Sequence, residues 1–114
     1  MGKHEELPLF VLWVEFTDWL FDRTEKFPKK VRFTFSSRID NLTLDILEKI
    51  IEACYTRGRS PILKDINLNL DKLRVLLRLC HKREYLSHKS FEHAVKQIHK
   101  AGTMCGAWKK KEAE

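Results

Sequence analysis

The segment from Phe35 to Tyr55 constrains the fold of this chain more strongly than any other. Its apolar residues follow one another at steps of three and four, so they share one face of a helix. The residues on this face are Phe35, Ile39, Leu42, Ile46, Ile50 and Ala53. Leu47, Ile51 and Cys54 widen the face to the breadth expected of a core helix. We therefore expect this segment to be the central helix of a small bundle with several partner helices.

The apolar spacing predicts four helices, which cover residues 8–25, 29–57, 61–83 and 88–110 and leave a frayed tail at 111–114. Gly58 is expected to end the second helix in the left-handed conformation. Ser60 and Ser87 are expected to cap the starts of the third and fourth helices. Short connections between four helices predict a single all-α domain over residues 1–114, an up-down-up-down antiparallel four-helix bundle.

The same spacing assigns an inward face to each of the other helices. On the first helix these residues are Leu9, Leu12, Trp13, Phe16, Trp19 and Leu20. On the third they are Leu63, Ile66, Leu70, Leu73, Leu77 and Cys80. On the fourth they are Phe91, Ala94, Val95, Ile98, Gly102 and Cys105.

The cysteines and the N-terminus bear on the location of the protein. Cys54, Cys80 and Cys105 are widely spaced on predicted apolar faces and form no CxxC or CxxH pair, so we interpret them as reduced core residues. The first residues, MGKHEE, lack the apolar region of a signal peptide. No apolar run is long enough to span a bilayer. The sequence is typical of a cytoplasmic protein that does not enter membranes.

Catalytic and metal-binding motifs are not evident. The chain has no Gly-rich phosphate loop, no HExxH and no GxSxG. The histidines at positions 4, 81, 88, 93 and 99 include no pair at i, i+3 or i, i+4, the spacing that a metal site on one helix needs. We expect a protein without catalytic residues, metal or cofactor.

Basic residues gather where two turns are expected to meet. The formal net charge is +6, which favours a polyanion as partner. In an up-down bundle the turn between the first two helices lies at the same end as the turn between the last two. The basic residues collected there are Lys26, Lys29, Lys30, Arg32, Lys82, Arg83, His88 and Lys89, and the row of Arg74 and Arg78 leads towards them.

Two interpretations of these charges remain open. Cations spread over an end and a flank suit phosphate contacts, which give affinity without sequence choice. The alternative is a solvated surface whose cations complement the carboxyl ends of helices. No exposed aromatic residue is expected among the cations, so a platform for stacking single-stranded bases is not predicted.

A second surface is predicted to join subunits. Leu68, Val75 and Leu79 form a narrow apolar stripe on the outer side of the third helix, where a monomer gains nothing from it. The first helix carries an outward acidic row. Its members are Glu15, Asp18, Asp22 and Glu25, and the first three are the predicted subunit contacts. Packing the first helix of one copy against the third helix of the next would pair acids with Arg74 and Arg78, a heterologous contact that closes into a ring.

The sequence resembles a known family in several blocks. DRTEKFPK, RFTFSSRIDN, KLRVLLRL, REYLS and a terminal Gly-Trp-Lys pattern resemble the accessory variability determinant (Avd) proteins of diversity-generating retroelements. These blocks lie within Leu7 to Lys110, nearly the whole chain. A sister group, the four-helix proteins encoded in rRNA intervening sequences, shares the fold.

The resemblance implies a barrel-shaped homopentamer that binds a reverse transcriptase and nucleic acid, either template RNA or cDNA, and supports mutagenic retrohoming without catalysing a reaction. Carried over by position, the partner contacts would be Arg74, Arg78, Lys82 and Arg83. An rRNA intervening-sequence protein remains an alternative. A further alternative is a HEPN-like ribonuclease, because Arg83 and His88 form an R-x4-H pattern.

Overall fold

A computed structural model describes residues 7–113 of the chain. The N-terminal segment, where no targeting signal is expected, lies outside the described residues. His4 is part of that segment. Within them all regular structure is helical, which confirms the all-α class. The four α-helices are α1 (Pro8–Thr24), α2 (Ser37–Cys54), α3 (Ser60–Lys82) and α4 (His88–Ala113). A 3-10 turn, η2 (Lys29–Val31), and a π-helix, η3 (Arg32–Ser36), precede α2.

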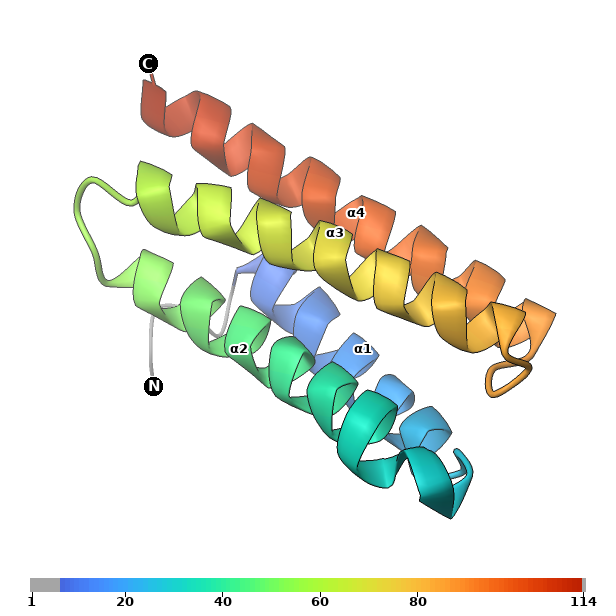
Figure 1. The fold of residues 1–114 in the computed structure, drawn as a ribbon. Coiled ribbons are helices and arrows are strands. Elements are labelled where there is room, and N and C mark those ends of the chain that lie inside the picture. The colour runs from blue at the N-terminus through green and yellow to red at the C-terminus, as the bar shows by residue number, and fades with distance from the viewer. Residues whose placement is uncertain (1–6, 114) are drawn as a thin grey trace.

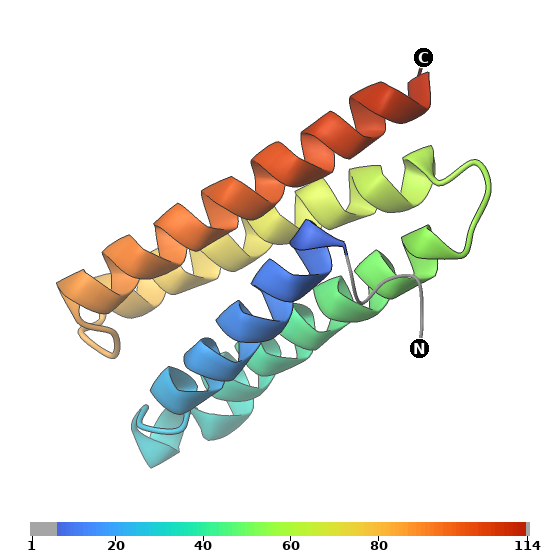
Figure 2. The same cartoon turned by 180° about the vertical axis from the view of Figure 1, so that it is seen from behind.

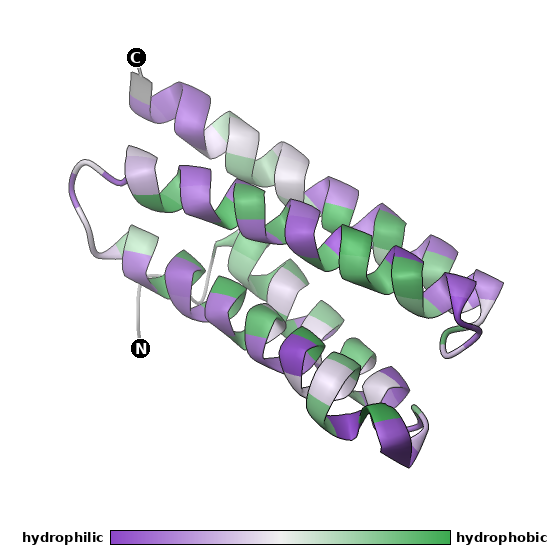
Figure 3. Cartoon of the chain, in the orientation of Figure 1, coloured by the Kyte–Doolittle hydropathy of each residue, from purple (hydrophilic) through white to green (hydrophobic). Residues whose placement is uncertain are grey.

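Each α-helix packs against its neighbour in the chain, and α1 also packs against α4. The turns that join α1 to α2 and α3 to α4 lie at one end of the molecule, and the α2–α3 loop lies at the other (Figures 1 and 2). Apolar and polar residues alternate along the helices, as expected when each buries one face (Figure 3). No helix within residues 7–113 has both the length and the apolar character needed to cross a membrane.

The residues of the predicted core faces are buried to different degrees. On α3 all six predicted residues are at most 3% exposed. On α2, Ile39, Ile46, Ile50 and Ala53 are buried, whereas Leu42 is only partly buried. Phe35, which was predicted to share this face, lies in η3 and is also partly buried. The predicted residues that are buried on α1 and α4 are Leu9, Trp13, Phe16, Leu20, Ala94, Ile98 and Cys105. Leu12, Trp19, Phe91, Val95 and Gly102 are partly buried at the margins, and Ala101 is an additional buried residue.

Threonines take core positions that the apolar pattern did not assign to them. Thr43 is fully buried, and its hydroxyl donates to the Ile39 carbonyl at 2.7 Å. Thr17 does the same to the Trp13 carbonyl, also at 2.7 Å. The Trp13 indole N–H donates to the Thr43 carbonyl at 2.9 Å and so joins α1 to α2. Since each hydroxyl bonds a carbonyl of the preceding turn, these residues are buried without unsatisfied polar groups.

Several predicted helix boundaries are wrong. The second helix was expected over 29–57, but η2 and η3 interrupt its start and α2 ends at Cys54. Gly58 does adopt a left-handed φ of 61°, but it lies beyond the helix in the connecting loop. Ser60 is the first residue of α3 and makes no capping hydrogen bond, so the N-cap is Arg59. Ser87 does cap α4, because its hydroxyl accepts the Ser90 N–H at 3.1 Å.

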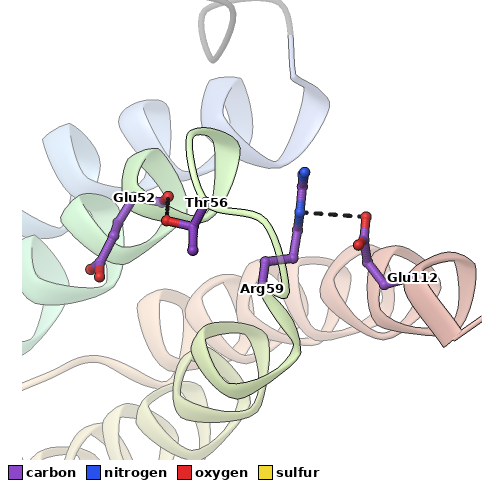
Figure 4. A network of polar contacts seen from close by, with 4 residues as sticks. All are labelled: Glu52, Thr56, Arg59 and Glu112. Carbon is purple, nitrogen blue, oxygen red and sulfur yellow. Dashed lines mark hydrogen bonds and ion pairs between the residues drawn. The ribbon is translucent and has the colours of Figure 1, made fainter.

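The predicted frayed tail is also wrong, because α4 continues to Ala113. Arg59 in the α2–α3 loop explains the extra turn. Its guanidinium lies 5.2 Å from the centre of the Trp108 ring. Its Nε lies 3.4 Å from Glu112 Oε1 (Figure 4). Within this loop the Thr56 hydroxyl donates to the Glu52 carbonyl at 2.7 Å (Figure 4). The contacts of Arg59 therefore fasten the end of α4 to the loop, and the Thr56 hydrogen bond ties the loop to α2.

Candidate nucleic-acid interface

The two turns at one end of the bundle are joined by aromatic side chains. The Tyr85 ring, in the α3–α4 turn, lies 6.1 Å from the Phe27 ring and 5.9 Å from the Phe35 ring. Phe27, and Leu86 next to Tyr85 in the chain, are buried. Rings at these distances and tilts attract one another beyond the apolar area that they bury. The packing therefore holds the basic residues of both turns at the same end.

The α3–α4 turn has a defined backbone geometry. The Tyr85 N–H donates to the Cys80 carbonyl at 2.9 Å and the Glu84 N–H donates to the His81 carbonyl at 3.0 Å. This pair of bonds is the Schellman motif that ends many helices, and it places one residue in the left-handed region. Glycine usually fills that position, but here it is Glu84, with φ of 64°. The turn is thus fixed at some cost in backbone energy.

The π-helix η3 places its two phenylalanines differently. The Arg32 carbonyl accepts both the N–H and the hydroxyl of Ser37, the latter at 2.9 Å, which closes the wide π turn. Phe35 points inward against Tyr85, whereas Phe33 is 87% exposed. The expectation that no aromatic residue is exposed among the cations is therefore wrong. Apolar spacing missed Phe33 because it does not predict a π turn, a feature often found at functional sites.

Most of the predicted basic residues are exposed. Those with exposed side chains are Lys26, Lys29, Lys30, Arg32, Arg78, Lys82, Arg83, His88 and Lys89. Among the described residues none of these lysines and arginines forms an ion pair with a carboxylate. Arg83 lies 6.0 Å from the centre of the Tyr85 ring, which positions its charge at the joint between the turns. Their charges are available to an anionic partner.

Arg74 differs from the other predicted residues. It is partly buried and forms an ion pair with Asp71, one turn earlier on α3. It also lines a shallow hollow between α3 and α4, together with His99 and Thr103. Because the neighbouring carboxylate offsets its charge, Arg74 is a weaker candidate for phosphate contact than Arg78. The sequence row of Arg74 and Arg78 does not distinguish the two.

A partly buried carboxyl group lies beside the same end. Asp40, on the first turn of α2, accepts a hydrogen bond from the Thr24 hydroxyl at 2.8 Å. Burial raises the pKa of Asp40 above its ordinary value, and the hydrogen bond from Thr24 opposes part of that rise. Asp40 lines a hollow of about 500 Å³ together with Lys29 and Arg32.

The histidines at this end pack against one another. His81 stacks on Phe91, with ring centres 4.7 Å apart, and lies 5.3 Å from the ring of His88. His88 Nε2 is 3.0 Å from a Glu92 carboxylate oxygen. Arg83 and His88, the R-x4-H pair, thus flank one turn but have different neighbours. In the part of the chain that the structure describes, no group of three or more His, Cys, Asp or Glu residues is placed to hold a metal ion.

The proposed subunit contacts lie on open surfaces. Leu68, Val75 and Leu79 are 54%, 42% and 42% exposed. The acidic row of α1, Glu15, Asp18 and Asp22, is also exposed, and two exposed valines accompany it. These valines are Val11 and Val14. Both surfaces are free in a single copy of the chain, and their pairing stays a prediction.

These features define a small all-helical protein with exposed cations at one end and apolar stripes on its outer faces. The sequence model of a protein family described as bAvd-like matches residues 13–112. The chain therefore belongs to the bAvd-like family, which points to an accessory protein of the Avd type. No curated protein sequence matches the chain.

Proposed function

We propose that this protein is a non-catalytic, cytoplasmic accessory protein of a diversity-generating retroelement. It binds the reverse transcriptase and nucleic acid, either template RNA or cDNA, and supports mutagenic retrohoming. Family membership together with the unpaired cations at the turn end carries this proposal. A protein that recognises phosphates uses exposed Lys and Arg side chains that no carboxylate neutralises.

We further propose that the up-down-up-down bundle assembles into a homopentameric barrel. The exposed stripe of Leu68, Val75 and Leu79 would be covered by the outer face of α1 from a neighbouring copy. The acids of α1 would then face cations of α3, and Arg78 is free to pair. A contact between two different faces generates a ring when the rotation closes.

Light-scattering mass at low and high salt, with and without a structured RNA, tests both parts. A mass of about five subunits and RNA binding that weakens steeply with salt support the proposal. Replacing Lys82 and Arg83 with Gln should lower the slope of log affinity against log salt by about 0.7–0.9 for each lost phosphate contact. Lys64→Gln, near the opposite end of α3, is the matched control. A monomer that does not bind RNA at any salt concentration would contradict the proposal.

Charge reversal tests the subunit contact separately. Arg78→Glu should reduce the mass in solution, whereas Lys100→Glu, at an exposed position on α4, should leave it unchanged. An unchanged mass in the Arg78 variant would count against the pairing of α1 with α3.

A ribonuclease of the HEPN type remains the second candidate, because Arg83 and His88 flank one turn. His88→Ala should abolish cleavage of RNA in such an enzyme and leave an accessory protein unaffected. An rRNA intervening-sequence protein would be distinguished by the gene beside its own, an rRNA instead of a reverse transcriptase.

A further inference from the structure

Phe33 is the most exposed large apolar side chain in the described residues, at 87%. It projects from the π-helix η3 while Phe35, two residues later, supplies the inward contact to Tyr85. The bundle thus gains almost no packing from Phe33. An exposed aromatic ring held on a fixed turn needs an explanation outside the fold.

The charges around Phe33 indicate what it contacts. Residues 26–39 contain five basic residues and no acidic one. The basic residues are Lys26, Lys29, Lys30, Arg32 and Arg38, all exposed. A ring among unneutralised cations is the arrangement with which proteins hold single-stranded nucleic acid, since the ring stacks on a base and the cations contact phosphates.

An open groove continues from Phe33 between α2 and α3. It has a volume of about 810 Å³, and Phe33 and Arg38 line it together with Lys72 and Val75 on the α3 side. Val75 also belongs to the apolar stripe proposed to contact a neighbouring copy, so the groove borders that contact. Two acids also line it, Asp71 and Asp45. Asp71 is paired with Arg74, and Asp45 lies seven residues beyond Arg38, about 10 Å along α2. The part of the groove next to Phe33 is therefore cationic and apolar.

We propose that Phe33 is a stacking platform for an unpaired base of single-stranded nucleic acid, with Lys29, Lys30, Arg32 and Arg38 contacting the adjoining phosphates. This rests on the proposed nucleic-acid binding and specifies its substrate as unpaired strand. A base in a duplex stacks on its neighbours and cannot present its face to the ring. Because every base has a π-face, the contact tolerates any sequence.

Fluorescence anisotropy with the full chain tests this. The probes are a single-stranded RNA of roughly 12 nucleotides, within the length range of single-strand sites, an abasic strand of the same length and a blunt duplex. Phe33→Ala should weaken binding to the single strand by between about 5-fold and 150-fold, the range for loss of one stacked base. Binding to the abasic strand and to the duplex should not change. Phe33→Tyr should keep the wild-type affinity.

Two controls separate stacking from other effects. Leu44→Ala, on α2, removes an exposed apolar side chain outside the groove and should change nothing. The salt slope should be the same for Phe33→Ala and wild type, because stacking releases no counterions.

The outcomes distinguish the two proposals. If the wild type binds none of the probes, the proposed nucleic-acid function fails and this inference with it. If the wild type binds the probes and Phe33→Ala binds each of them as tightly as the wild type does, only the stacking role is overturned. If Phe33→Ala lowers the mass in solution, or weakens binding to the abasic strand as much as binding to the intact strand, Phe33 is an assembly contact and not a stacking platform.

Discussion

Replacing Glu84 with Gly should stabilise the protein. Glu84 occupies the left-handed position of the α3–α4 turn, with φ of 64°. That conformation costs a residue with a side chain about 1–2 kcal/mol. Gly avoids this cost but loses about 0.5–1 kcal/mol more backbone entropy on folding. Among the described residues the Glu84 side chain forms no hydrogen bond or ion pair. The free energy of unfolding should therefore rise by about 0.5–1 kcal/mol.

Urea denaturation followed by tryptophan fluorescence measures this change, which corresponds to about 2–5 °C in the melting temperature. Glu84→Gln removes the charge and keeps the side chain, so it separates electrostatics from backbone strain. Gly58→Ala is the converse change, because Gly58 has φ of 61° and an added Cβ meets no atom within 4 Å. It should destabilise by about 0.5–1 kcal/mol, the same balance with the opposite sign. If Gly58→Ala behaves as expected and Glu84→Gly is neutral or destabilising, the reasoning is refuted.

Three other substitutions have defined outcomes. Trp13→Phe removes the hydrogen bond to the Thr43 carbonyl and leaves a small cavity, so urea titration should show a loss of about 2 kcal/mol. Asp40 has a pKa raised by burial, so its ionisation opposes folding as the pH rises above 3.8. Asp40→Asn should therefore be more stable than wild type near neutral pH, and the difference should vanish in urea titrations below pH 3.8. Arg59→Ala should speed amide hydrogen exchange at the end of α4, residues 108–113, while α3 stays protected.

How well the fold could be predicted depended on whether the apolar spacing followed an α-helix. On α3 steps of three and four alternate, which keeps the apolar face aligned with its neighbours, and every predicted core residue is buried. Before α2 the apolar residues Phe27, Val31, Phe35 and Ile39 are spaced by four throughout. In an α-helix each such step turns the face by about 40°. The π turn, which has more residues per turn than an α-helix, takes up part of this drift, so the signal was present but was attributed to a regular helix.

The site was only partly predictable, for a related reason. Charges on turns and outer faces are exposed in any packing of the helices, so the basic end could be located from sequence. Which charges are neutralised depends on side-chain geometry, as the ion pair of Arg74 with Asp71 shows. The contact of Arg59 with Trp108 and Glu112 joins residues some fifty positions apart and leaves no local pattern. Phe33 could not be separated from core phenylalanines by hydropathy alone.

The position of the three native thiols makes the surface of this protein accessible to selective chemistry. Cys54, Cys80 and Cys105 are all buried, and burial raises the pKa of Cys80 and of Cys105 to about 11. Alkylating reagents attack the exposed thiolate, so these residues react slowly while the bundle stays folded. A single cysteine introduced at an exposed position such as Lys89 would be labelled ahead of them. Spectroscopic probes can thus be attached at chosen points without removing any native cysteine.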